Sequence, residues 1–237
     1  MEKVAVEKLT AGMVLARSIF QSDGRILVRK NVEISSSIIA RLKDLRFPAA
    51  YVETAPSSDL NEPVSDLTRS EVIQSVAKLD SAFRSGKGIN FLACRTPLQK
   101  MIFEVIENKQ VHLNTIEIRS LNDTIYNHMV QVCVIAIRIA LAMGYDQAKL
   151  FELALGVLFH DIGMTRIASD ILNRIGGLTS DEIIQIRNHP KQAMTWLNKA
   201  GTFLEQPRKS FSNIMKDIMG RGTRKSLAVF IFMNMLE

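Results

Sequence analysis

The sequence predicts an α+β protein in which a small β-rich N-terminal domain precedes an all-α domain. Apolar and polar residues alternate in short runs up to residue 53, a stretch rich in Pro, Ser and Asp follows, and the apolar spacing of amphipathic helices then takes over. The 237 residues are enough for two domains. The predicted units are residues 1–53, a linker at 54–66, a helical domain at 67–204 and a tail at 205–237.

The first domain shows extended runs at residues 13–20 and 26–29, separated by a Ser-Asp-Gly-Arg turn at 22–25. Helical spacing follows over residues 35–45, where Ile38, Ile39, Leu42 and Leu45 fall on one face. Residues 51–52 suggest a closing strand. This pattern predicts a small unit with mixed strands and one helix.

Residues 54–63 lack periodicity and suit an exposed linker. A capping box at residues 68–71 then predicts the start of a helix, which the Gly-Lys-Gly sequence at 86–88 should end. Further helices are predicted at 92–107, 123–143, 147–159 and 181–188, the last opened by a second capping box at 179–182. No strand is predicted after the linker, so this domain should be helical throughout.

The net charge of +6 suggests an acidic partner at first sight, because basic proteins often bind nucleic acid or anionic membranes. Half of this charge arises from residue 205 onward, where six basic residues outnumber three acidic ones. The sequence shows neither basic residues interspersed with aromatic ones, as in a nucleic-acid-binding groove, nor the cysteine and histidine spacing of a zinc finger. The sequence therefore predicts no nucleic-acid partner.

Membrane insertion and disulfide bonding are not expected either. The longest apolar stretch, near residues 130–143, is interrupted by Arg138, and residues 226–236 are too few to span a bilayer. No secretory signal is evident at the start. The two cysteines, Cys94 and Cys133, form no spacing motif and are interpreted as small core residues. A cytoplasmic location is predicted.

The most informative feature is the adjacent pair His160-Asp161, which follows an apolar helix. An imidazole can fix one metal ion and a carboxylate can bridge two, and first-row metals accept both ligand types. Two such ions a few Å apart stabilise the attacking and leaving oxygens of a phosphoryl displacement. Asp161 is therefore the candidate catalytic residue.

Two of the four histidines, His128 and His189, lie on the predicted helical segments that flank this pair. Taken singly, each histidine also fits a role in the core or at a helix end. Three adjacent helices could instead converge on one centre. The trio favours a metal site with His128, His160, Asp161 and His189 as ligands.

At this point the sequence resembles the HD-GYP family. The resemblance is carried by Asp-Thr-Ile-Tyr-Asn-His at 123–128, the motif at 159–164, Ile-Leu-Asn-Arg-Ile-Gly-Gly-Leu-Thr at 171–179 and Asn-His-Pro at 188–190. The family consists of bacterial phosphodiesterases that hydrolyse the second messenger cyclic-di-GMP with two or three iron or manganese ions. The resemblance implies metal-ligand roles for the four residues, an HD-type helical domain and a role in signal transduction.

The N-terminal region, including Leu-Thr-Ala-Gly-Met-Val-Leu-Ala-Arg at 9–17, resembles a small domain that often precedes HD-GYP domains. We interpret it as a regulatory or dimerising module. A homodimer is therefore an open expectation.

Two departures from the family pattern affect the chemistry. Met164 stands where the family usually has the Lys that closes its HDIGK motif, which removes a cation suited to meeting a phosphate. The family's segment of two histidines and a glutamate followed by Gly-x-Gly-Tyr-Pro is absent as written, and no histidine follows His189. A cluster without those ligands should bind its metal ions incompletely.

The missing segment should lie near residues 213–224. Codons permitted by the genetic code can be chosen for this stretch so that reading from the third base encodes HHERYYGKGYP. The methionine codons force the glutamate and the first glycine of that string, and the other matches depend on the codons chosen. We hypothesise a frameshift between residues 203 and 212 that makes the following tail out-of-frame translation. The opposing interpretation is a genuine divergent helix or a solvated basic end.

Three functions remain open from the sequence. The first is an HD-GYP phosphodiesterase for cyclic-di-GMP, impaired in this chain by the missing segment and by Met164. The second is a non-catalytic nucleotide-sensing or scaffold protein with a degenerate HD domain. The third is an HD phosphohydrolase for a different nucleotide, in which His128, His160 and Asp161 act with another carboxylate.

Overall fold

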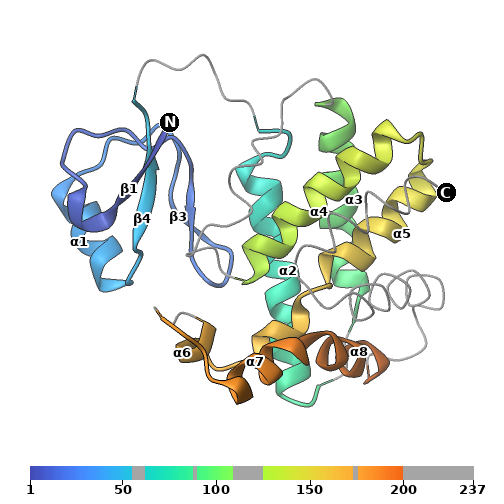
Figure 1. Cartoon of the computed structure of the whole chain (residues 1–237). Helices are drawn as coiled ribbons and strands as arrows, with labels where there is room; N and C mark the ends of the chain where they lie inside the picture. Colours follow the sequence, from blue (N-terminus) through green and yellow to red (C-terminus); the bar gives the residue numbers. More distant parts are fainter. Residues whose placement is uncertain (55–61, 88–89, 109–124, 173–175, 200–237) are drawn as a thin grey trace.

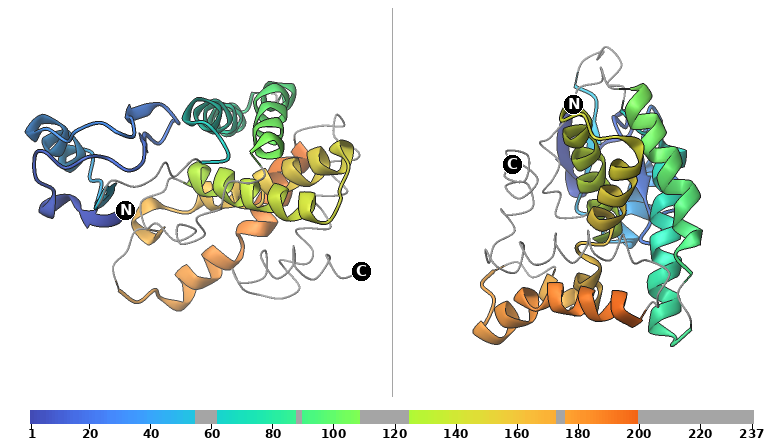
Figure 2. Two further views of the ribbon diagram at one scale, coloured as in Figure 1. Left: turned by 90° about the horizontal axis from the view of Figure 1, so that it is seen from above. Right: turned by 90° about the vertical axis from the view of Figure 1, so that its right-hand side faces the viewer.

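The computed structural model describes residues 1–54, 62–87, 90–108, 125–172 and 176–199. A strand-containing N-terminal unit lies beside a helical body, as Figure 1 shows from the front and Figure 2 from above. The predicted tail at 205–237, with the segment at 213–224, falls outside the described residues. The α+β class is confirmed.

The N-terminal unit contains two small antiparallel sheets. Strand β1 (Glu2–Ala5) pairs with β4 (Ala49–Val52), and β2 (Ile19–Phe20) pairs with β3 (Ile26–Val28). The short helix η1 (Val6–Lys8) follows β1, and helix α1 (Ser36–Asp44) precedes β4. Their apolar side chains form a separate core of Val6, Leu9, Leu15, Ile34, Leu42, Ala50 and Val52.

The extended run predicted at residues 13–20 forms a strand only at its end. Val14 and Leu15 make isolated bridges to two different partners, Glu33 and Val52. Backbone hydrogen bonds join residues 12–16 to 31–34 on one side and to 51–53 on the other, but the regular ladder of this run is confined to β2. The run predicted at 13–20 thus contains the regular strand Ile19–Phe20 and isolated bridges before it.

The helical body begins with α2 (Asp66–Arg84), α3 (Leu92–Glu107), α4 (Ile125–Ala142) and α5 (Gln147–Leu158). It continues with the 3-10 helix η3 (Ile162–Arg166) and then with α6 (Ser169–Leu172), α7 (Ser180–Arg187) and α8 (His189–Lys199). Helix α4 packs on α5, α2 packs on α3, and α8 packs on η3. The helices predicted from periodicity agree with these bounds to within two residues, apart from the start of α2.

Helix α2 begins earlier than its predicted capping box. Ser65 is the N-cap, and its Oγ accepts a hydrogen bond from the backbone N–H of Thr68 at 3.3 Å. Glu104 of α3 accepts a further bond from the backbone N–H of Ser65 at 2.7 Å. Because these oxygens satisfy the first free N–H groups, the helix starts at Asp66 and Thr68 is buried inside it.

Helix α4 alone among the described helices is long and apolar enough to cross a membrane by length and composition, with a mean hydropathy of 1.6. The core helix of a folded domain passes the same test. Here α4 contributes buried residues to the core and contacts α2, α3 and α5. Both cysteines are free and buried in that core, which confirms their interpretation as core residues.

The N-terminal unit rests against the first half of α2. Gly24, at the tip of the hairpin formed by β2 and β3, has φ +84°, and a Cβ built there would lie 2.6 Å from Cγ2 of Ile73. Ser70 Oγ donates a hydrogen bond of 2.6 Å to the Gly24 carbonyl oxygen. Ser18 Oγ also donates to the Asp66 carboxylate. Only glycine permits this close approach of the hairpin to the helix.

Glu62 adds an ionic contact at the same junction. Its carboxylate lies 2.9 Å from Arg69 of α2 and 3.5 Å from Arg17 of the N-terminal unit. Burial alone would raise the pKa of Glu62, but the charges of Arg69, Arg17 and Lys30 hold that pKa below its ordinary value. Glu62 is therefore ionised and joins the two parts of the chain.

Candidate metal centre

The four predicted ligand residues come from three parts of the helical body. His128 lies in the first turn of α4, His160 and Asp161 lie between α5 and η3, and His189 is the first residue of α8. Phe159 ends α5, and the 3-10 turn of η3 redirects the chain directly after Asp161. These local breaks place the His-Asp pair at the end of a buried helix.

The position of His189 depends on the segment before it. Thr179 and Glu182 form the predicted capping box, in which each side chain accepts a bond from the other residue's backbone N–H. This box starts α7, and Asn188 ends it. Helix α8 then begins at His189, with Pro190 in its first turn, where a missing N–H has no consequence.

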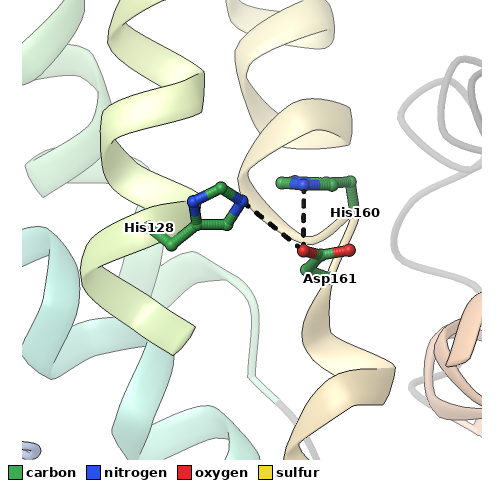
Figure 3. A group of neighbouring side chains, drawn as sticks. All are labelled: His128, His160 and Asp161. Atoms are coloured by element: carbon green, nitrogen blue, oxygen red, sulfur yellow. Dashed lines mark ion pairs between the residues drawn. The ribbon is translucent and has the colours of Figure 1, made fainter. Parts of the chain in front are cut away.

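The carboxylate of Asp161 faces all three imidazoles. His128 Nε2 lies 3.6 Å and His160 Nε2 3.4 Å from Asp161 Oδ2, while His189 Nε2 lies 3.2 Å from Oδ1. Figure 3 shows His128 projecting from α4 towards Asp161, and the dashed lines from His128 and His160 meet at the same carboxylate oxygen. The structure thus brings all four predicted residues together.

Backbone hydrogen bonds orient two of the rings. His160 Nδ1 lies 2.8 Å from the Val157 carbonyl oxygen, and His189 Nδ1 lies 2.7 Å from that of Ile186. A carbonyl can only accept, so each Nδ1 carries the proton in the neutral ring. In the neutral ring each Nε2, on the side of Asp161, then offers a lone pair to a cation, which is the arrangement seen in metal-binding histidines.

Opposite charges dominate the electrostatics of the centre. Burial would raise the pKa of Asp161, but the charge of His160, hydrogen bonds from His160 and His189 and the charge of His189 hold that pKa well below its ordinary value. Burial would lower the pKa of His160, yet the Asp161 carboxylate raises it. Asp161 is therefore an anion that attracts whichever cation the site holds.

The donor set fits a divalent first-row ion. Ligand atoms of His128, His160 and Asp161 all lie within 4.8 Å of one another, and His189 reaches the other oxygen of the same carboxylate. Side-chain exposure falls from 30% for His128 to 6% for His160, so most of the donors are shielded from water. Imidazole and carboxylate together suit iron, manganese, cobalt or zinc.

Two residues that follow Asp161 in the motif, Gly163 and Met164, contribute to packing. A Cβ built on Gly163 would lie 1.9 Å from the carbonyl oxygen of His189, so only glycine lets η3 lie this close to α8. Met164 is 4% exposed and belongs to the apolar interior. The position of the family's lysine is therefore a core position in this chain.

Sequence reasoning missed Asp80, which is fully buried on α2. Its Oδ2 accepts hydrogen bonds from the Tyr126 hydroxyl at 2.9 Å and from Arg84 Nε at 2.7 Å. Burial first, and the Asp80 charge second, raise the pKa of Tyr126 to about 12, so the phenol keeps its proton and donates. The helical period offered a signal, because Asp80 lies four residues after buried Val76, on the apolar face.

Comparison with known proteins identifies the family. A family model described as an HD domain matches residues 100–228, more than half of the chain. The chain belongs to the HD domain family. The match includes all four residues of the candidate centre. The match also extends beyond residues 203–212, where we placed the hypothetical frameshift. The frameshift itself stays a prediction.

Two known proteins are similar to this chain. It is 26% identical over 114 residues to "Cyclic di-GMP phosphodiesterase PA4108" of Pseudomonas aeruginosa, an alignment that covers 48% of this chain and 28% of that protein. The aligned part therefore spans less than a third of the relative's length. The structure of Bd1817, described as an HDG"Y"P protein from Bdellovibrio bacteriovorus, matches with a TM-score of 0.50 at 16% identity, over 97% of this chain and 84% of that one. This likeness concerns the fold.

Proposed function

We propose that this chain is a metal-dependent phosphodiesterase of HD-GYP type that hydrolyses cyclic-di-GMP. One observation carries the proposal: the Asp161 carboxylate faces three imidazoles whose Nε2 atoms lie 3.2 to 3.6 Å from its oxygens. The family match and the activity in the name of the Pseudomonas protein support the choice of substrate. We also propose a cytoplasmic location and a regulatory or dimerising role for the N-terminal unit.

In this proposal His128, His160, Asp161 and His189 hold the divalent ions, either iron or manganese. The ions would supply a Lewis acid for the phosphate oxygens and would lower the pKa of water at the site. Asp161 places its anionic charge between the histidines, and the backbone carbonyls of Val157 and Ile186 keep two rings in position. During hydrolysis a water oxygen bonds to phosphorus, one P–O ester bond breaks, and the leaving oxygen takes a proton.

Direct assay tests this function. The purified full chain is loaded with Mn²⁺ or Fe²⁺ under a reducing atmosphere, its metal content is measured, and it is incubated with cyclic-di-GMP. A parallel series with other cyclic dinucleotides and nucleoside phosphates separates this activity from an HD phosphohydrolase of different specificity. Stoichiometric metal with no turnover on any substrate would contradict the enzymatic proposal and favour a sensor.

Impairment of the enzyme, meaning reduced rather than absent turnover, is part of the proposal, because no histidine follows His189. Its source can be checked by sequencing the gene from the codon for His189 to the stop and translating every forward register. The string HHERYYGKGYP in a shifted register would support a frameshift in an HD-GYP gene. Its absence in all registers would mean that the tail is native and would favour the non-catalytic alternative.

The buried side chain of Met164 favours a second candidate function, a non-catalytic nucleotide-sensing or scaffold protein. A core methionine cannot supply the cation that would meet a phosphate. Such a protein would keep the HD fold and bind a cyclic dinucleotide without hydrolysing it. Binding of cyclic-di-GMP without any product would support this candidate.

Met164→Lys is expected to destabilise the fold without raising hydrolysis. An ammonium group at a site that is 4% exposed must either lose its hydration or release its proton, so the free energy of unfolding should fall by about 2–5 kcal/mol. Urea unfolding and turnover measure the two effects. Met164→Leu is the control, with an expected loss below about 1.5 kcal/mol. A stable, more active Met164→Lys variant would show that residue 164 reaches the phosphate.

A further inference from the structure

Asp80 is a fully buried carboxylate on α2 that does not belong to the proposed metal centre. Charged side chains are rarely buried without partners, because removal from water carries a large free-energy penalty. Asp80 lies near the C-terminal end of α2, a helix that holds none of the four candidate ligands. Its partners therefore indicate what this buried charge does.

One set of contacts reaches the helix that bears His128. The hydroxyl of Tyr126 donates to Asp80 Oδ2 at 2.9 Å. Tyr126 lies two residues before His128, in the first turn of α4. This bond fixes the start of α4 against α2.

The other set reaches the segment that follows Asp161. The Thr165 hydroxyl lies 2.7 Å from the Ile162 carbonyl oxygen and 3.2 Å from Asp80 Oδ1, so the two acceptors share its one proton. Arg166 Nη2 lies 3.6 Å from the same Asp80 oxygen. Thr165 and Arg166 both belong to η3, the turn that begins directly after Asp161. The two oxygens of one carboxylate therefore hold two different elements of the candidate centre.

Two arginines strengthen this link. Arg84 donates from Nε to Asp80 at 2.7 Å and from Nη2 to the Thr165 carbonyl oxygen at 2.8 Å, so it ties α2 to η3 a second time. The guanidinium of Arg166 also lies over the Phe83 ring at 4.5 Å. Bonds to charged partners are stronger than neutral ones, and a network whose members all have partners holds a single geometry.

We propose that Asp80 is a positioning residue that sets the separation of His128 and Asp161 by holding α4 and η3 to the same carboxylate. These two side chains come from different elements and approach to 3.6 Å. Metal ligands depend on such outer contacts for their orientation, and loss of one contact typically lowers affinity 10- to 100-fold. The inference rests on the metal site of the proposed function.

The test measures Co²⁺ binding to the full chain after chelator treatment, with the visible absorption bands of Co²⁺ as a report on ligand geometry. Asp80→Asn replaces the charge with an amide of the same shape. Its Co²⁺ affinity should fall about 10- to 100-fold, and the bands should shift.

Because Asp80→Asn could fail to fold, we add a double variant, Tyr126→Phe with Thr165→Val. It removes the two hydroxyl donors and leaves the carboxylate paired with its arginines. That variant should also weaken Co²⁺ binding and shift the bands.

Glu71→Gln is the matched control, because Glu71 lies on the same helix and pairs with Lys100 at 3.0 Å on the surface. It should bind Co²⁺ as the unaltered chain does. Wild-type affinity and bands in the double variant would overturn the inference, even if Asp80→Asn were unstable. A purely structural role would lower the unfolding temperature without moving the bands, which would also overturn it. If the unaltered chain bound no Co²⁺, the proposed function itself would fail, and this inference would fail with it.

Discussion

Asp161→Asn is expected to abolish hydrolysis and to lower metal occupancy sharply. The carboxylate faces three imidazoles, and the asparagine amide would keep its shape without its charge. An amide oxygen cannot bridge two ions as a carboxylate does. The NH₂ group of the asparagine would also face an imidazole or an ion. Since loss of an outer contact alone reduces affinity or activity 10- to 100-fold, loss of this ligand should reduce turnover by more than about 100-fold.

The measurement combines metal analysis after dialysis with turnover of cyclic-di-GMP, and circular dichroism confirms that the variant is folded. Asp44→Asn provides the same chemical change at an exposed position of the N-terminal unit. That control should retain full metal content and activity. Unchanged turnover in Asp161→Asn would refute the proposed centre.

Gly163→Ala is expected to separate α8 from the rest of the centre. The added Cβ would lie 1.9 Å from the His189 carbonyl oxygen and 2.9 Å from the Ala193 backbone nitrogen, and these are main-chain atoms that no side-chain rotation can move. Overpacking of a well-packed core typically costs 1–3 kcal/mol, so we expect a loss of about 3 kcal/mol in the free energy of unfolding. His189 would move with its helix, which should also weaken metal binding.

Urea unfolding and Mn²⁺ titration together measure these two effects. Gly177→Ala is the control, because a Cβ at Gly177 meets nothing within 4 Å and should leave both quantities unchanged. If Gly163→Ala bound Mn²⁺ with wild-type affinity, the close packing of η3 on α8 would not be what holds His189 in place.

Much of the helical domain could be predicted because its signals are local. The capping box of Thr179 and Glu182 and the apolar spacing of α3, α4 and α5 depend on residues within one or two turns of each other. The start of α2 could not be predicted in this way. Glu104, which helps to satisfy its first N–H groups, lies 39 residues away from Ser65 on a different helix.

The short strands of the N-terminal unit show the same limit. Alternation along residues 13–20 resembled a regular strand, yet Val14 and Leu15 pair with partners in two different segments. Strand pairing depends on which neighbour the chain meets after folding, and the alternating pattern carries no information about that choice.

The sequence by itself determined the fold class, most helix bounds and the four residues of the candidate centre. Residue types and spacing sufficed there because helix formation and metal preference are local properties of side chains. Only the tertiary structure showed that Asp161 lies between three imidazoles, that Gly163 lets α8 approach, that Met164 is buried and that Asp80 joins α4 to η3. Each of these depends on contacts between segments far apart in the chain, and such contacts exist only once the helices have packed.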